Sequence, residues 1–139
     1  MSKAIKKIIS TSNAIKPVGP YSQAVVLDKT VYVSGVLGID KETSKLVEGG
    51  TIPQARQALK WLGVILEASG SSYDNIVKTQ IFLNNINDLG AVNEVYKEFF
   101  KGDYPARSSF QVGKLPLGAD IEIEAVAAVG EVTTISAKM

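Results

Sequence analysis

Apolar residues recur at helical spacing in two stretches of the chain, each of which predicts one amphipathic helix. The first covers residues 52–69, and the second runs from Asp88, a suitable N-cap residue, to about residue 100. In the first helix, Arg56 lies on a polar face that we expect to be solvated. The apolar face of the first helix consists of Ala55, Leu59, Leu62 and Leu66. That of the second helix consists of Leu89, Val92, Tyr96, Phe99 and Phe100.

Short runs of β-branched and apolar residues between turn residues predict strands. In one of them Val77, Thr79, Ile81 and Leu83 alternate onto one side. The element order is β-β-β-α-β-α-β-β, which indicates an α+β fold: one domain (1–139) with a mixed sheet and both helices on one face. The expected strands are residues 6–10, 22–27, 30–34, 75–84, 107–112 and 121–129.

Composition excludes several kinds of chemistry. The chain has no Cys and no His, so thiolate nucleophiles, disulfides, Cys-ligated metals and His-dependent catalytic relays are ruled out. The remaining carboxylates have no metal-binding spacing, and the glycines form no dinucleotide or phosphate-loop motif. The net charge of +1 is far below that of a typical nucleic-acid-binding domain.

Arg107 is the most distinctive candidate for binding an anion. It is one of only two arginines, against thirteen lysines, and it follows Pro105 just before a strand. A guanidinium in such a rigid setting suits bidentate binding of a carboxylate or phosphate. An ion pair with Glu122 or Glu124 explains its position equally well at this stage.

Glu122 and Glu124 lie two residues apart in a strand, so both carboxylates share one face of the sheet. The pattern alone favours a solvent-facing strip. However, Val126 and Ala128 continue the same face, so part of it needs cover, and a carboxylate at the edge of that cover could position or deprotonate a water.

Three further positions are candidates for contact with a ligand. Asn93 falls on the apolar face of its helix, where a buried amide must bind a ligand or tie down a loop, and the pattern favours the loop. Tyr21 follows the stiff pair Gly19-Pro20 and could face a cleft. Ser34 and Gly35 end a strand where a ligand could approach the backbone closely.

A series of short blocks, in order along nearly the whole chain, resembles the RidA (YjgF) family of enamine and imine deaminases. The most specific block is Pro105-Ala106-Arg107-Ser108, running on to Val112. Two further blocks are Gly19-Pro20-Tyr21-Ser22-Gln23-Ala24 and Ile121-Glu122-Ile123-Glu124-Ala125. The others are Tyr32-Val33-Ser34-Gly35, Ile76-Val77-Lys78-Thr79, Asn87-Asp88-Leu89, Val92-Asn93-Glu94-Val95-Tyr96 and Leu115-Pro116.

The resemblance implies a chorismate mutase-like fold and a barrel-like homotrimer with ligand clefts at the subunit interfaces. It implies hydrolysis of 2-iminopropanoate and 2-iminobutanoate to 2-oxo acids and ammonia, without a metal or cofactor. Arg107 would hold the substrate carboxylate, and Glu122 would hold or activate the attacking water near the backbone carbonyl of Ser109. The residues that line and order the cleft would be Tyr21, Ser34, Gly35 and Asn93.

Two positions depart from the family pattern. Ser109 stands where many members have Cys, so thiol-dependent behaviour is not expected, and Val36 stands where Gln is frequent. Two alternative functions stay open at this point. One is that of an endoribonuclease or translation inhibitor, as some animal relatives are described, and the other is that of a non-catalytic carboxylate-binding or chaperone-like protein. RNA is a possible partner but not the favoured one, given the scattered lysines.

No apolar run is long enough to cross a membrane, and the basic N-terminus lacks the apolar stretch of a signal peptide. A cytoplasmic location is therefore expected. Residues 137–139 loosely resemble a peroxisomal address, and mitochondrial, nuclear or peroxisomal pools stay open.

Overall fold

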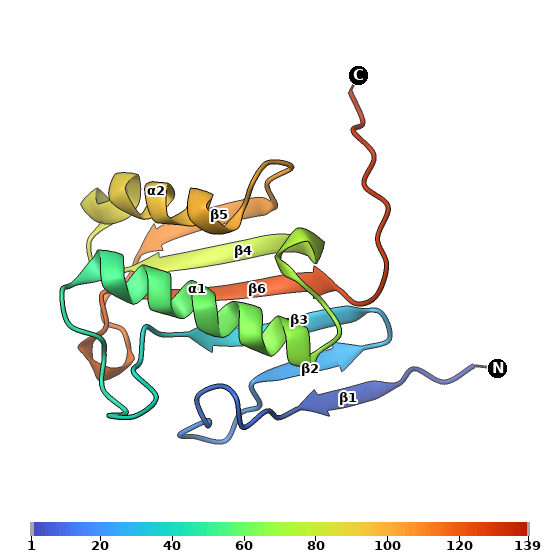
Figure 1. Cartoon of the computed structure of the whole chain (residues 1–139), viewed down its shortest axis with the longest axis horizontal. Coiled ribbons are helices and arrows are strands. Elements are labelled where there is room, and N and C mark those ends of the chain that lie inside the picture. Colours follow the sequence, from blue (N-terminus) through green and yellow to red (C-terminus); the bar gives the residue numbers. More distant parts are fainter. Residues whose placement is uncertain (1, 139) are drawn as a thin grey trace.

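A computed structural model describes residues 2–138, in which six strands form one sheet and two α-helices pack against it (Figure 1). The order of strands and helices is the predicted one, and most boundaries agree within two residues. The helices are α1 (Thr51–Ala68) and α2 (Leu89–Phe99). The strands are β1 (Lys6–Ile9), β2 (Ala24–Leu27), β3 (Thr30–Val36), β4 (Ile76–Leu83), β5 (Ala106–Gln111) and β6 (Ile121–Ala128).

The sheet is mixed, with the strand order β1-β2-β3-β6-β4-β5. Strands β4 and β5 pair in parallel, because the chain crosses over through α2 between them, and the other neighbours are antiparallel. Both helices cover the same face of the sheet, as Figure 1 shows. The α+β architecture predicted from the sequence is confirmed.

The core lies between the helices and the covered face of the sheet. Helix α1 buries the predicted apolar stripe, and β4 and β6 supply the alternate residues that meet it. The largest fully buried side chains of this core are Leu59, Leu62, Leu66, Ile81, Leu83, Ile121 and Ile123.

The opposite face of the sheet has no helix on it, and we call it the open face. It carries Glu122, Glu124 and Val126 from β6, beside Tyr32, Phe82 and Phe110 from the neighbouring strands. Tyr32 and Phe110 are 49% and 47% exposed, and the rings of Phe82 and Phe110 stack with centroids 6.3 Å apart.

One local prediction was wrong for an identifiable reason, and another was confirmed without the side-chain hydrogen bond that is usual at its position. A bulge between Ile76 and Lys78 turns Val77 outward, so Ile76 is buried in its place. Asp88 is the N-cap residue of α2, as predicted, but its carboxylate makes no hydrogen bond to the start of α2 and instead accepts one from the Thr51 hydroxyl at 2.7 Å. That bond joins the starts of the two helices.

Two loops beside α1 and β3 are held by side-chain hydrogen bonds to the backbone. The Gln23 amide bonds the backbone of Thr11 and Ile15, fixing the segment before β2. Trp61 on α1 donates its indole N–H to the Ile39 carbonyl at 2.7 Å, fixing the segment after β3. These two segments form walls of the larger pocket described below.

Candidate functional site

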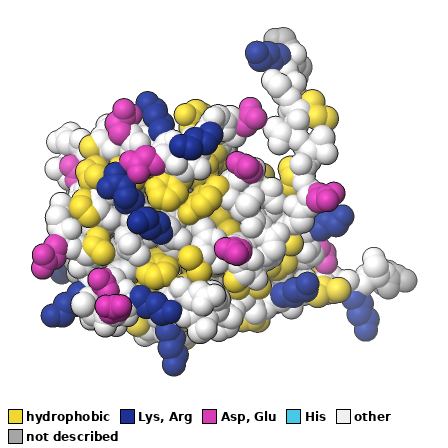
Figure 2. Space-filling view, in the orientation of Figure 1, with side chains coloured by type: hydrophobic (Ala, Val, Ile, Leu, Met, Phe, Trp, Pro, Cys, Tyr) yellow, Lys and Arg dark blue, Asp and Glu magenta, His cyan; other side chains and the backbone are white. Residues whose placement is uncertain are grey.

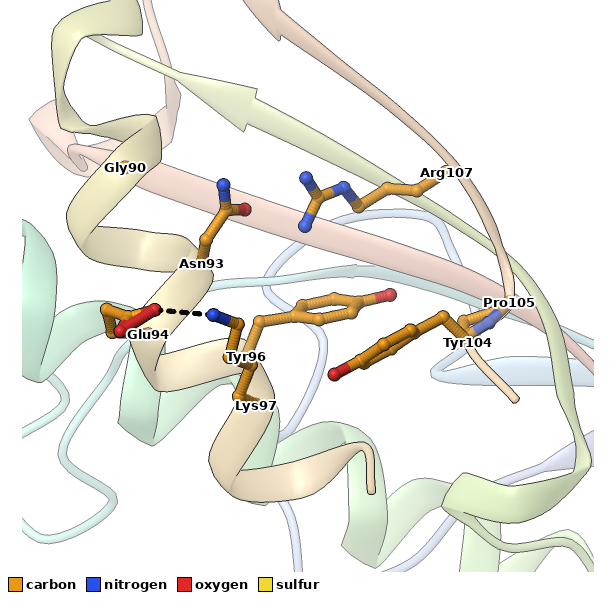
Figure 3. A pocket seen from close by; sticks show the side chains of 8 residues that line it. All are labelled: Gly90, Asn93, Glu94, Tyr96, Lys97, Tyr104, Pro105 and Arg107. Carbon is orange, nitrogen blue, oxygen red and sulfur yellow. Dashed lines mark ion pairs between the residues drawn. The ribbon is translucent and has the colours of Figure 1, made fainter. Parts of the chain in front are cut away.

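The predicted site residues other than Ser109 fall into two separate pockets. The smaller, of about 400 Å³, lies between α2 and the start of β5 and contains Arg107 and Asn93 (Figure 3). The larger, of about 860 Å³, contains Tyr21, Ser34, Gly35, Val36, Glu122 and Glu124. Ser109 lines neither pocket, although its side chain is on the same face of β5 as that of Arg107.

Arg107 and Glu122 project from opposite faces of one sheet. Arg107 pairs with the fully buried Thr79 of β4, which places its side chain on the helix side at the edge of the sheet. Glu122 pairs with Phe82 on the open face. The alternative explanation of Arg107, an ion pair with Glu122 or Glu124, is therefore wrong.

The guanidinium of Arg107 lies over the ring of Tyr96, with Cζ 4.9 Å from the ring centroid (Figure 3). Within residues 2–138, no carboxylate oxygen lies within 4.0 Å of its nitrogens. By contrast, Arg56 is half-exposed and forms a bidentate pair with Glu98 at 3.0 and 2.8 Å, which lowers the pKa of Glu98. The prediction that Arg56 lies on a solvated face is confirmed, and the ion pair with Glu98 of α2 is an addition to it.

Two polar atoms near Arg107 are buried without a partner. These atoms are the Asn93 side-chain oxygen and the Ser109 hydroxyl, and neither has a hydrogen-bond partner in the described part of the chain. The side-chain oxygen of Asn93 therefore does not hold a loop in place, contrary to the interpretation that the sequence favoured. Because a buried unpartnered acceptor is costly, this oxygen is available to a donor on a ligand.

Glu122 is half-buried beside Gly35. A Cβ atom built on Gly35 would lie 2.5 Å from Oε1 of Glu122, so the carboxylate occupies the space that a side chain would need. Burial raises the pKa of Glu122, and the charge of Glu124 on the same strand face raises it further. The absence of a side chain at Gly35 thus makes room for a carboxylate rather than directly for a ligand.

Ser34 and Tyr21 shape the larger pocket around Glu122. The Ser34 hydroxyl donates to the Ser22 carbonyl at 2.6 Å, which links the end of β3 to the segment carrying Tyr21. Tyr21 is 52% exposed, and its backbone N–H bonds the Gly19 carbonyl in the tight turn expected at Gly19-Pro20.

Sequence reasoning missed the tyrosines of the smaller pocket. The sequence placed Tyr96 on the apolar face of its helix and gave no reason to single out Tyr104, yet both line the pocket of Arg107. A signal was present in Tyr96, since a hydroxyl on an apolar helix face needs a partner, here the Thr79 hydroxyl at 2.9 Å. Burial raises the pKa of Tyr96.

Two further findings limit the chemistry and setting of the site. Among the described residues, no three acidic side chains come close enough together to hold a metal ion. None of the helices there is both long and apolar enough to span a membrane.

The fold and pockets define an α+β domain with an arginine at the edge of its sheet that has no acidic partner among residues 2–138. The sequence profile of the family described as Endoribonuclease L-PSP matches residues 11–129, and the chain belongs to this family, which is that of the RidA (YjgF) proteins. The resemblance noted in the sequence is thus confirmed.

Relatives and solved structures resemble the chain over most of its length. The Drosophila melanogaster RutC family protein UK114 is 57% identical over 96% of this chain and 97% of its own length. The human 2-iminobutanoate/2-iminopropanoate deaminase is 51% identical over 98% of this chain and 99% of its own. The RidA structure from an Antarctic Psychrobacter has a TM-score of 0.85 and 41% identity, covering 88% of this chain and 99% of that one. The structure of Escherichia coli TdcF with bound serine has a TM-score of 0.84 and 38% identity, covering 89% of this chain and 99% of that one.

Proposed function

We propose that this protein hydrolyses small 2-imino acids, such as 2-iminobutanoate and 2-iminopropanoate, to 2-oxo acids and ammonia. The observation that carries the proposal is the unpaired guanidinium of Arg107 in a pocket of about 400 Å³. Several relatives at about half identity bear the name of this deaminase. A bound amino acid in the related TdcF structure agrees with a site for small carboxylates.

We further propose that the active site forms between subunits of a homotrimer. Arg107 and Glu122 point to opposite faces of one chain, so they can reach one small substrate only if they come from different subunits. The open face, with the exposed rings of Tyr32 and Phe110, would be covered in the trimer. Tyr21, Ser34 and Gly35 would line the cleft around Glu122, while Asn93 and Ser109 would lie with Arg107.

In this proposal Arg107 binds the substrate carboxylate through two parallel N–H···O bonds. Glu122 of the neighbouring subunit accepts a proton from a water as the water oxygen bonds to the imine carbon. As the C=N double bond becomes a single bond, its π electrons pass to the nitrogen, and Glu122 then returns the proton to that nitrogen. The C–N bond breaks with its electron pair going to ammonia, while Glu122 takes the proton of the new hydroxyl group and the carbonyl of the 2-oxo acid forms. Holding the carboxylate and the water in place is the main contribution, because a protonated imine is already electrophilic.

The test measures 2-oxobutanoate release from threonine and a dehydratase in an amine-free buffer. Wild-type protein should accelerate release, and Arg107→Ala should lower the acceleration by about 100-fold or more, since hydrogen bonds to charged groups contribute about 1.5–3 kcal/mol each. Arg56→Ala is the matched control, because it removes the other arginine, which lines neither pocket. Equal release with and without wild-type protein would refute the deaminase proposal.

Mixing two inactive variants tests the shared site. Arg107→Ala and Glu122→Gln are unfolded together and refolded, so that mixed trimers form. If each site takes Arg107 from one subunit and Glu122 from the next, roughly a quarter of the sites regain both residues and activity returns. No recovery in verified mixed trimers would place both residues in one subunit's site and refute this arrangement.

The family description favours a second candidate, cleavage of RNA. Basic and acidic side chains are interspersed over the helix-covered face in Figure 2, and the net charge is +1. An intrinsic nuclease should keep its activity through purification and lose it steeply as salt increases.

A cytoplasmic location stays a prediction from the sequence.

A further inference from the structure

The side chain of Arg107 is held by an aromatic ring rather than by an acid. Its Cζ is 4.9 Å from the centroid of the Tyr96 ring, within the range of a cation–π contact. Across residues 2–138 the only ion pairs are Arg56 with Glu98 and Lys97 with Glu94. Among residues 2–138, therefore, no carboxylate competes for the N–H donors of Arg107.

Tyr96 is itself fixed from several directions. Its hydroxyl and that of Thr79 are 2.9 Å apart, and Thr79 is fully buried in the centre of the sheet. Its ring stacks on Phe100 with centroids 4.2 Å apart and planes at 22°. The Tyr96 side chain therefore cannot turn away without breaking a buried hydrogen bond and an aromatic contact.

We propose that Tyr96 is a positioning residue for Arg107: its ring holds the guanidinium so that the N–H groups face the pocket, and Thr79 fixes the ring. The inference rests on the proposed function, in which Arg107 binds the substrate carboxylate. A ring suits this task better than an acid, because it restrains a long, flexible side chain without occupying its donors.

This arrangement predicts an effect on binding rather than on the chemical step. Without the ring, the guanidinium samples more orientations and must be ordered again by each substrate. Tyr96→Met fills similar space without an aromatic face, and we expect it to raise KM and the Kd for 2-oxobutanoate about tenfold, with kcat nearly unchanged. Tyr96→Phe keeps the ring and should stay within about threefold of wild type.

The binding experiment is titration calorimetry with 2-oxobutanoate, after each variant has shown the wild-type oligomer mass. The double variant Tyr96→Met with Arg107→Ala should bind no more weakly than Arg107→Ala alone, since the ring acts only through the guanidinium. Wild-type affinity in Tyr96→Met would overturn the inference. A loss of the same size in the Arg107→Ala background would overturn it too, because the ring would then act independently of Arg107.

A second measurement needs neither activity nor a foldable Tyr96→Met. The chain has only two arginines, so the Nε–H groups of Arg107 and Arg56 should give two assignable NMR signals. In the wild type the Arg107 proton should be shifted upfield by the Tyr96 ring and should be as restrained as that of Arg56. A mobile, unshifted Arg107 signal would refute the inference even if the protein is a deaminase. A shifted, restrained signal in a protein that neither binds 2-oxobutanoate nor deaminates would refute the proposed function and leave the Tyr96 contact standing.

Discussion

The carboxylate of Glu122 occupies the space over Gly35 that a Cβ atom would need, at 2.5 Å from Oε1. Gly35 lies at the end of β3 and Glu122 near the start of β6, so two neighbouring antiparallel strands bring together residues that are far apart in sequence. Gly35 thus determines where the proposed general base lies, although it contributes no functional group.

Gly35→Ala should lower activity without unfolding the protein. The added methyl group meets the far end of a flexible side chain, so Glu122 can swing aside at little cost to stability. We expect kcat to fall by about tenfold or more, while the free energy of unfolding changes by less than about 1 kcal/mol.

Gly113→Ala is the matched control, because a Cβ atom there would meet nothing within 4 Å. It should retain wild-type kcat. Full activity in Gly35→Ala would show that the placement of Glu122 over this glycine is unimportant for the reaction.

The acid side of the pH–activity profile should report the ionisation of Glu122. Burial raises the pKa of this carboxyl, and the negative charge of Glu124 raises it further, so activity should fall as pH decreases through a value above the ordinary range of Glu. Glu124→Gln removes the like charge and should move this limb to lower pH in profiles of kcat/KM. An unchanged limb would mean that another group controls it.

Glu122 should also make the protein less stable at neutral pH. Its pKa is higher in the folded than in the unfolded chain, so the folded state binds the proton more tightly and stability is lost as pH rises through that range. Glu122→Gln should therefore have a Tm at pH 7 at least equal to that of wild type, and the difference should disappear below about pH 4, where the carboxyl is protonated in the unfolded chain too. A lower Tm at pH 7 would indicate that the carboxylate makes stabilising contacts in the assembled protein.

The sequence predicted the elements well, because the periodicity of the apolar residues directly reflects which side chains meet the core. It also placed Glu122 and Glu124 on one face and Ile121 and Ile123 on the other, as the structure has them. It could not predict the bulge that exposes Val77, since a one-residue irregularity leaves little trace in a single sequence.

Contacts between distant elements were beyond the sequence. That Arg107 and Glu122 face opposite sides depends on the register of β5 and β6 against the shared strand β4, which no local pattern specifies. Likewise Asp88 has the residue type of an N-cap, but its carboxylate bonds Thr51 on the other helix. The sequence could therefore predict which residues belong to a site, but not which of them lie together.

Asn93→Ala should separate ligand binding from a structural role. The side-chain oxygen of Asn93 is buried without a partner in the described chain, so its removal should leave the free energy of unfolding within about 0.5 kcal/mol of wild type. Affinity for 2-oxo acids should fall by several-fold, measured by calorimetry. The opposite pattern, a clear loss of stability with unchanged affinity, would restore the loop-tying interpretation.

Gly63→Ala should destabilise the protein, although alanine normally favours a helix by about 0.8–1.0 kcal/mol over glycine. A Cβ atom on Gly63, in the middle of α1, would lie 2.1 Å from the hydroxyl oxygen of Tyr73, which donates to the Leu59 carbonyl at 2.6 Å. Burial raises the pKa of Tyr73 to about 12, so the hydroxyl stays a donor near neutral pH. The centroid of the Tyr73 ring lies 5.5 Å from that of Phe99 and 6.0 Å from that of Phe100, so the ring cannot easily move away.

Overpacking of this kind costs about 1–3 kcal/mol, which exceeds the gain in helix propensity. We therefore expect urea unfolding of Gly63→Ala to shift to lower denaturant with an unchanged m-value. In a Tyr73→Leu background the obstacle is removed, and the same substitution should become neutral or stabilising because only the helix propensity remains. If Gly63→Ala stabilises the wild-type chain, the Tyr73 hydroxyl must leave the helix more readily than these contacts indicate.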